Sequence, residues 1–313
     1  MEIVFKVEKK DDLDEIFKLI NGEDIACQNV INKEISSYVS KMCKLLDITK
    51  IHRIMYGSEF CQFRMPSESN VKELIKICEE KNISFTLQTP HVDEYGMDKM
   101  KKLLDALTSY EIEIEVNDLG VLNYISKCEH KWTLVAGRMW DQSFHDGRLS
   151  AKEQIIYYGQ SNEDFMPATP LDSDDYKLIF NKYSLNIINI DATVSKNEEM
   201  QGYGLYFPYV YMTTGGICKM RCLSQDVNAK FSIDKNTCEM KCTKYDETMN
   251  KSFVDMSDNN IEFKEGYTLR RVKMYKKGNT VFYIPCSIVE DVEKYSENVK
   301  NFERIVFETK LML

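Results

Sequence analysis

Apolar and polar residues alternate along this chain with two different periods, and the two periods follow one another in turn. Short apolar runs rich in β-branched and aromatic residues predict β-strands, and most are followed by segments with apolar residues at helical spacing. The predicted strands are Glu2–Val7, Ile51–Tyr56, Ser84–Gln88, Glu111–Val116, Trp132–Ala136, Leu185–Ile190 and Leu205–Met212. Strands that alternate with helices in this way predict βα units and a parallel sheet.

The strand count favours a closed (β/α)8-type, TIM-like barrel, or a distorted form of it, over a doubly wound open sheet. The first strand also lacks the G-x-G-x-x-G motif that binds dinucleotides in Rossmann folds. We expect the barrel to occupy residues 1–248, with a long polar insertion at 139–171 that is typical of a lid or binding loop. Residues 249–313 are expected to form a small α+β extension, with a hairpin around Lys277-Gly278-Asn279 and a last strand at Ile305–Thr309.

Composition and charge narrow the classes of function. The chain has 313 residues, 43% of them hydrophobic and 29% charged, which is ordinary for a globular protein. Its 41 basic and 50 acidic residues give a net charge of −9, which argues against broad binding to nucleic-acid phosphates. We find neither a signal-peptide pattern nor the ~18 consecutive apolar residues that a membrane span needs. We therefore expect a cytoplasmic protein.

Ten cysteines are notable in such a protein, because a reducing compartment disfavours disulfides and clustered thiols there indicate metal binding or catalysis. Cys218, Cys222, Cys238 and Cys242 form two C-x3-C pairs within 25 positions. Four-thiolate zinc sites usually contain C-x2-C pairs, whereas C-x3-C suits the looser ligand geometry of an iron–sulfur cluster. Spacing alone selects these four cysteines as ligands and does not decide between a zinc site and an iron–sulfur cluster.

Three segments resemble the family known as peptidase U32. IMYGSEFCQFRM (Ile54–Met65) is similar to a strand-end segment of that family, in which a short loop carries a cysteine and an arginine. IEVNDLGVLNYI (Ile114–Ile125) is similar to its strand–turn–helix motif, and RCLSQDVNAKFSIDKNTCEMKC (Arg221–Cys242) to its cysteine segment. The resemblance spans roughly Ile51–Tyr245. It is greatest to the smaller iron–sulfur subunit of the pair that hydroxylates ubiquinone precursors without oxygen.

The resemblance implies a 4Fe-4S cluster bound by Cys61, Cys222, Cys238 and Cys242, with Cys218 as the runner-up ligand. It also implies oxygen-independent hydroxylation, or a related redox modification, of a small molecule, an RNA base or a peptide. Prephenate would be the cosubstrate, and a second U32-like subunit or another protein would be the partner. A true peptidase is less well supported, because the chain contains neither H-E-x-x-H nor G-x-S-x-G.

Several other residues stand at or near the ends of predicted strands, where a barrel places its substrate cavity. These candidates are Arg64, His91, Asn117, Asp118, Arg138 and Asp191. The two arginines suit an anionic small molecule, and Asp118 equally suits a helix cap. No catalytic residue follows from the sequence, and two hypotheses stay open. One is a redox enzyme, and the other is a non-catalytic cluster-bearing subunit that positions a partner enzyme or peptide.

Overall fold

The structure is a computed structural model of the chain. It describes residues 1–23, 29–142, 148, 171, 173–192, 202–216, 218–222, 238–244, 247–248, 261–262, 268–269 and 272–313. Most of the expected insertion at 139–171 therefore lies outside the described residues. Among the helices described, none has the length and apolar character needed to cross a membrane.

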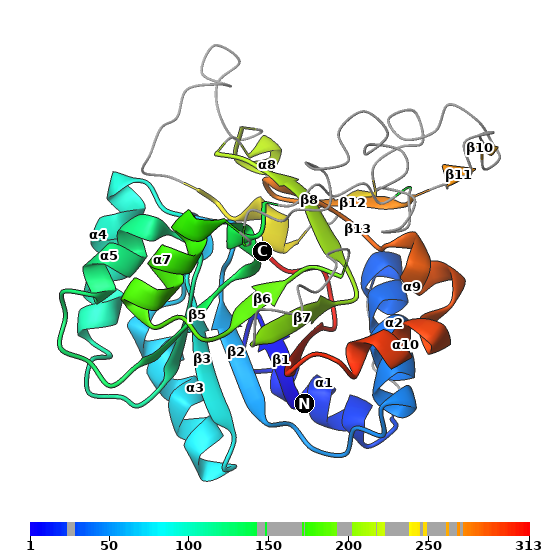
Figure 1. Cartoon of the computed structure of the whole chain (residues 1–313), viewed down its shortest axis with the longest axis horizontal. Coiled ribbons are helices and arrows are strands. Elements are labelled where there is room, and N and C mark those ends of the chain that lie inside the picture. Colours follow the sequence, from blue (N-terminus) through cyan, green and yellow to red (C-terminus); the bar gives the residue numbers. More distant parts are fainter. Residues whose placement is uncertain are drawn as a thin grey trace.

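Within the described residues, eight parallel strands form a closed barrel with helices on its outside (Figure 1). The strands are β1 (Glu2–Val7), β2 (Arg53–Gly57), β3 (Ser84–Gln88), β4 (Glu113–Val116), β5 (Thr133–Ala136), β6 (Ile188–Ile190), β7 (Tyr203–Phe207) and β14 (Arg304–Glu308). The helices are α1 (Asp12–Ile20), α2 (Val30–Leu45), α3 (Glu68–Glu80), α4 (Glu94–Asp105), α5 (Leu119–Ile125), α7 (Asp174–Tyr183), α9 (Cys286–Glu290) and α10 (Val292–Val299). The predicted (β/α)8-type barrel is confirmed.

The eighth barrel strand comes from the end of the chain. β14 pairs in parallel with β1, from Glu2 opposite Arg304 to Lys6 opposite Glu308, and on its other side with β7. The sequence pattern predicts this strand but places it in a separate extension. The expected boundary at residue 248 therefore does not separate the barrel from the C-terminal residues, because the barrel closes only when β14 lies between β1 and β7.

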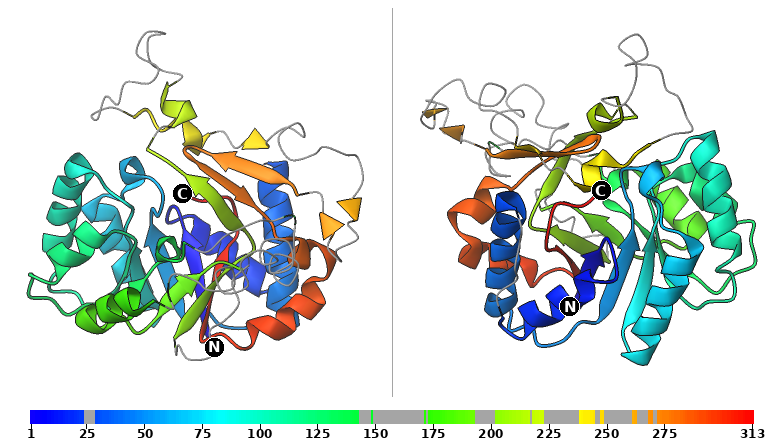
Figure 2. Two further views of the ribbon diagram at one scale, coloured as in Figure 1. Left: turned by 45° about the horizontal axis from the view of Figure 1, so that its top comes forward. Right: turned by 180° about the vertical axis from the view of Figure 1, so that it is seen from behind.

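A small second sheet lies over one end of the barrel (Figures 1 and 2). The predicted strand 205–212 is split at Pro208, which cannot donate to a sheet ladder, into β7 and β8 (Val210–Thr214). β8 joins β13 (Thr280–Tyr283), β12 (Met274–Lys277) and β9 (Glu247–Thr248), while β10 (Ile261–Glu262) and β11 (Thr268–Leu269) pair separately. The β12–β13 hairpin is the one predicted around Lys277-Gly278-Asn279.

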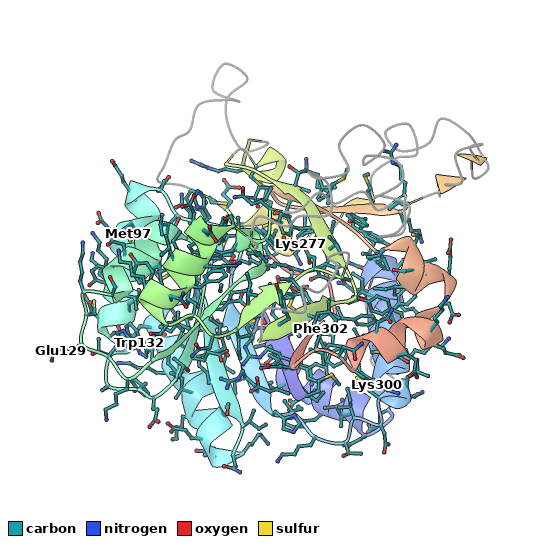
Figure 3. All side chains as sticks on the ribbon, in the orientation of Figure 1. Met97, Glu129, Trp132, Lys277, Lys300 and Phe302 are labelled. Atoms are coloured by element: carbon teal, nitrogen blue, oxygen red, sulfur yellow. The ribbon has the colours of Figure 1, made fainter. Side chains whose placement is uncertain are left out.

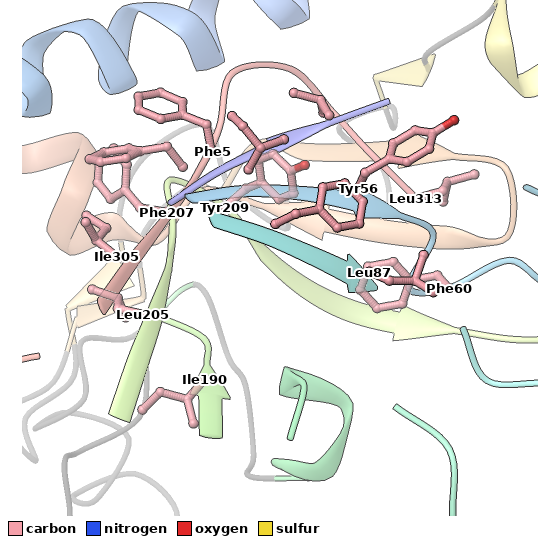
Figure 4. Packing of buried hydrophobic residues seen from close by; sticks show 14 of the residues in the cluster. Phe5, Tyr56, Phe60, Leu87, Ile190, Leu205, Phe207, Tyr209, Ile305 and Leu313 are labelled. Atoms are coloured by element: carbon pink, nitrogen blue, oxygen red, sulfur yellow. The ribbon is translucent and has the colours of Figure 1, made fainter. Parts of the chain in front are cut away.

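The outward faces of the barrel strands are apolar and pack against the helices. Figure 4 shows Phe5, Leu205, Phe207 and Ile305 from three neighbouring strands. The ring of Phe5 stacks on that of Phe307 with 5.0 Å between centroids. Fully burying each such side chain stabilises the fold by about 1.5–3 kcal/mol.

The inward faces of the same strands are largely polar. Near the amino ends of the strands, Arg304 donates to Glu113 at 2.8 Å and to Glu2 at 2.7 Å. Further along the barrel, Val4, Met55, Tyr206 and Val306 form a small apolar cluster. The carboxyl ends of the strands hold a second set of charged groups, which surrounds Arg138.

Candidate functional site

A cavity of about 510 Å³ lies beyond the carboxyl end of β2, between the barrel and the small sheet. The loop after β2, the loop after β3 and the turn of the β12–β13 hairpin all line it. Asn279 in that turn donates hydrogen bonds to the carbonyl oxygens of Phe60 and Gly215, both at 2.8 Å. The hairpin is thereby fixed to the rim of the barrel.

Four cysteines line this cavity, namely Cys61, Cys218, Cys238 and Cys242. Cys61 lies in the loop after β2, whereas the other three cysteines belong to the segment after β8. The backbone of Cys222 lies in α8 (Lys219–Cys222), but its side chain is outside the description. The cavity therefore brings Cys61, which the resemblance selects, together with Cys218, which spacing selects.

The donor set fits a metal centre that prefers sulfur. Thiolates bind zinc and iron–sulfur clusters, whereas calcium and magnesium take oxygen ligands. Among the side chains that the structure describes, no three His, Cys, Asp or Glu groups lie close enough to bind one metal ion. Burial raises the pKa of the Cys61 thiol to about 11, so a bound metal would have to displace its proton.

The space around Cys242 is restricted by the hairpin turn. Gly278 has a φ of +58°, which favours glycine. A side chain at this position would come within 2.8 Å of Leu313 Cδ1 and 3.6 Å of Cys242 Cβ. Glycine therefore lets the turn pack closely against Leu313, with Cys242 beside it at ordinary van der Waals distance. Lys277, beside it, is buried where the small sheet meets the barrel (Figure 3).

His91 and Asp118 form a hydrogen-bonded pair at the edge of the cavity. His91 lines the cavity, and its Nδ1 lies 2.8 Å from Asp118 Oδ2. Asp118 also accepts hydrogen bonds from the backbone N–H groups of Val121 at 3.0 Å and Val92 at 3.3 Å. The first of these caps α5, as one of the two sequence interpretations expects. The carboxylate thus holds the imidazole in one orientation.

Arg138 lies at the expected end of the barrel but inside it, not on the cavity. Its guanidinium is fully buried and pairs with Glu59 at 2.9 Å, Asp191 at 3.1 Å and Glu308 at 3.2 Å. It also stacks on the ring of Tyr206 at 3.9 Å. Three carboxyl groups already surround this cation, so it is not available to an anion in the cavity.

Asn117 has a connecting role at the same end. Its Nδ2 donates to the carbonyl oxygen of Thr89 at 3.0 Å, and its Oδ1 accepts from the N–H of Met139 at 3.4 Å. It therefore ties the loop after β3 to the loop after β5. Of the six cavity candidates, Arg64 and His91 line the cavity, while the other four support the barrel end behind it.

Most of the buried network around Arg138 does not follow from the sequence pattern. Its other members include Lys6, Glu59, Glu115 and Glu308, all with no exposed surface. Burial raises the pKa of Glu115 and of Asp191. Charged residues at alternate positions of otherwise apolar strands were the signal that could have revealed this network.

Comparisons with known proteins add little to this geometry. No family model matches the chain. No curated protein matches it either. A solved structure described as the U32 peptidase Mk0906 aligns with a TM-score of 0.33 and 10% sequence identity, over 66% of this chain and 69% of that one. At this TM-score the likeness decides neither the family nor the activity.

Proposed function

We propose that the chain is a U32-like protein that binds a 4Fe-4S cluster in the cavity through Cys61, Cys222, Cys238 and Cys242. The observation that carries this proposal is the position of Cys61. The loop after β2 exposes it to the same cavity as Cys238 and Cys242, although they are distant in sequence. When bound, such a cluster would supply one-electron transfer.

The proposed reaction is an oxygen-independent hydroxylation or a related redox modification. The cavity has the size of a small-molecule site, for which roughly 300–1,000 Å³ is usual. His91, oriented by Asp118, would exchange protons there, and Arg64 and Arg221 are cations on its walls. A small molecule, an RNA base or a peptide group would be the substrate, with an anion of the prephenate type as cosubstrate.

One observation favours a second function, that of a cluster-bearing subunit without catalysis of its own. Barrel enzymes usually bind substrate over the centre of the carboxyl ends of the strands. Here Arg138 and its carboxyl partners fill that centre, and the cavity lies to one side. In that case a second U32-like subunit or another protein would supply the active site. Peptidase activity is the weakest proposal, because both protease motifs are missing from the sequence.

Spectroscopy of protein purified without oxygen tests the cluster. We expect a brown protein whose electron paramagnetic resonance signal, after reduction with dithionite, is that of a 4Fe-4S cluster. Cys78→Ser is a matched control, because Cys78 is buried in α3 and does not line the cavity. This variant should keep the full signal. A colourless protein containing zinc would overturn the proposal.

A further inference from the structure

Two adjacent glycines in the loop after β8 are needed neither for an unusual backbone conformation nor for close packing against the described residues. Gly215 and Gly216 line the cavity, and neither has a φ in the left-handed region that favours glycine. A Cβ atom added at either position would meet no described atom within 4 Å, apart from its neighbours in the chain. Glycine is also the residue that lets a backbone come close to a ligand. The two glycines thus leave a bare stretch of backbone on the cavity wall.

The peptide between these glycines is held in one orientation. Asn279 Nδ2 in the hairpin turn donates to the carbonyl oxygens of Gly215 and Phe60, both at 2.8 Å. The peptide is trans, so the N–H of Gly216 points away from the carbonyl oxygen of Gly215 and hence away from Asn279. This N–H has no hydrogen-bond acceptor among the described residues. The loop therefore carries a fixed backbone donor with spare capacity.

Arg64 supplies a second donor on the wall of the same cavity. Its Nη2 lies 2.9 Å from Glu8 Oε1, which fixes the guanidinium. Its Nη1 is buried and has no hydrogen-bond partner in the part of the chain that the structure describes. A buried donor without a partner is costly, so an acceptor that enters the cavity gains from meeting it. Arg221 adds a further cation to the wall, 4.7 Å from the centre of the Phe63 ring.

The charge around Arg64 is net positive. Lys277 and Lys310 approach Glu8 at 3.6 Å and 3.9 Å, and Lys310 also pairs with Asp12 at 2.6 Å. Two carboxylates therefore face the three cations Arg64, Lys277 and Lys310. This excess of positive charge attracts an anion to this side of the cavity.

Much of the remaining wall is apolar. Phe63, Val92, Met139 and Leu313 line it, while Asp93 is the single acidic residue among the described lining residues and caps α4. In small-molecule sites, apolar walls bind the body of the ligand and a few polar groups fix its orientation. This cavity therefore suits a ligand with an apolar body and one anionic end.

We propose that Gly216 and Arg64 bind the oxyanion of an amphipathic small molecule, a carboxylate or a phosphate monoester, whose apolar part lies against Phe63 and Leu313. The inference rests on the small-molecule site of the proposed function, but it requires neither the cluster nor the side chain of Cys222. Arginine and backbone N–H groups are common donors to bound oxyanions. Either oxyanion has enough acceptor oxygens for both donors.

Calorimetric titration of the natural chain with three probes tests the inference. The protein is purified without oxygen, and its iron is measured in the same sample. Benzoate and phenyl phosphate carry the same ring on different oxyanions, and benzamide is the neutral counterpart of benzoate. We expect the two anions to compete for one site and benzamide to bind about tenfold more weakly or worse. The anion that binds more tightly identifies the kind of group that the site prefers.

Substitutions on the wall locate the binding. The double variant Gly215→Ala/Gly216→Ala should weaken binding of both anions about tenfold or more, because its methyl groups take up space at the bare backbone. Its thermal midpoint should stay unchanged, since the methyl groups meet no described atom. Arg64→Met should remove the preference for benzoate over benzamide, and Arg64→Lys should keep part of it. The glycine variant keeps the test decisive if Arg64→Met does not fold.

Two controls lie off the cavity. Thr213→Ala changes an exposed residue next to the glycine loop, and Arg53→Met changes an arginine that pairs with Glu2 at 2.8 Å. Both should bind the anions as the natural chain does. Anions that bind no better than benzamide would overturn the inference whatever the iron content, and so would unchanged affinity in the glycine and Arg64 variants. A chain that binds the anions but contains no iron would support this inference and overturn the cluster.

Discussion

Cys61 lies in the loop after β2, and local contacts fix its place. The hydroxyl of Ser58 donates to the carbonyl oxygen of Cys61 at 2.9 Å, and the side chain packs against the apolar core. Cys218, in contrast, precedes α8 and lines the cavity from a different segment. Both cysteines reach the site, so their roles must be separated by substitution.

We predict that Cys218→Ser leaves the cluster largely intact and that Cys61→Ser removes it or converts it to a smaller cluster. A serine oxygen is a weaker ligand for iron than a thiolate, so loss of one true ligand exposes an iron to solvent. Iron content and absorption of the two variants, purified without oxygen, measure this. The opposite pattern would show that Cys218 is the ligand and Cys61 is not.

The His91–Asp118 pair predicts a specific dependence on pH. The hydrogen bond that His91 donates to Asp118 raises the pKa of the imidazole above its ordinary value of 6.5. Because the folded-state pKa is raised, the pair stabilises the fold fully below the pKa of an unfolded histidine. That contribution is lost as the pH rises through the raised value. Asp118→Asn should therefore lower the pKa of His91, as measured by nuclear magnetic resonance.

The chain contains an internal control for this titration. Burial lowers the pKa of His130, which stacks on Trp132 and lies outside the His91–Asp118 pair. Its pKa should not move in Asp118→Asn, and asparagine can still cap α5. Asp93 is the other acidic group that acts on His91, and it is unchanged in this variant. An unchanged His91 pKa would contradict the role given to Asp118.

At the scale of single residues, the sequence predicted some features of the site and not others. It selected Cys61 only through a family resemblance, because no spacing rule connects a loop after the second strand with cysteines after the seventh. It predicted the cap at Asp118 correctly, since helix capping is a local property. It could not predict that Arg138 is enclosed, because its partners Glu59 and Glu308 come from distant parts of the chain.

At the scale of elements, the period of the hydrophobic pattern carried most of the information. All seven strands expected in the barrel are present, because each has an apolar outward face that packs on helices. β14 was also expected as a strand, but its place in the barrel was not. A strand's partners depend on closure of the whole sheet, which a local pattern does not encode.

The barrel strands are joined at their carboxyl ends by the network around Arg138. We predict that Arg138→Met destabilises the fold by about 3–5 kcal/mol, since it leaves buried carboxylates without their partner. Denaturant unfolding measures this free energy. The control is Lys10→Met, which removes a solvent-exposed pair with Glu73 at 2.6 Å and should change the free energy of unfolding far less. Equal effects of the two substitutions would contradict the role assigned to the network.

At the scale of the whole molecule, the fold brings the two ends of the chain and its middle to one place. β1 and β14 lie side by side, and the loops after β1 and β2 meet the hairpin turn at the cavity. The net charge of the chain is −9, so the cations around the cavity form a local positive region on an acidic protein. The site therefore depends on barrel closure and would be lost in a fragment without β14.

The measurement that tests the central claim most directly is the iron, sulfide and zinc content of the natural chain purified without oxygen. We predict about four irons and four sulfides per chain, with no zinc, as for one 4Fe-4S cluster. One zinc per chain and no iron would contradict the claim.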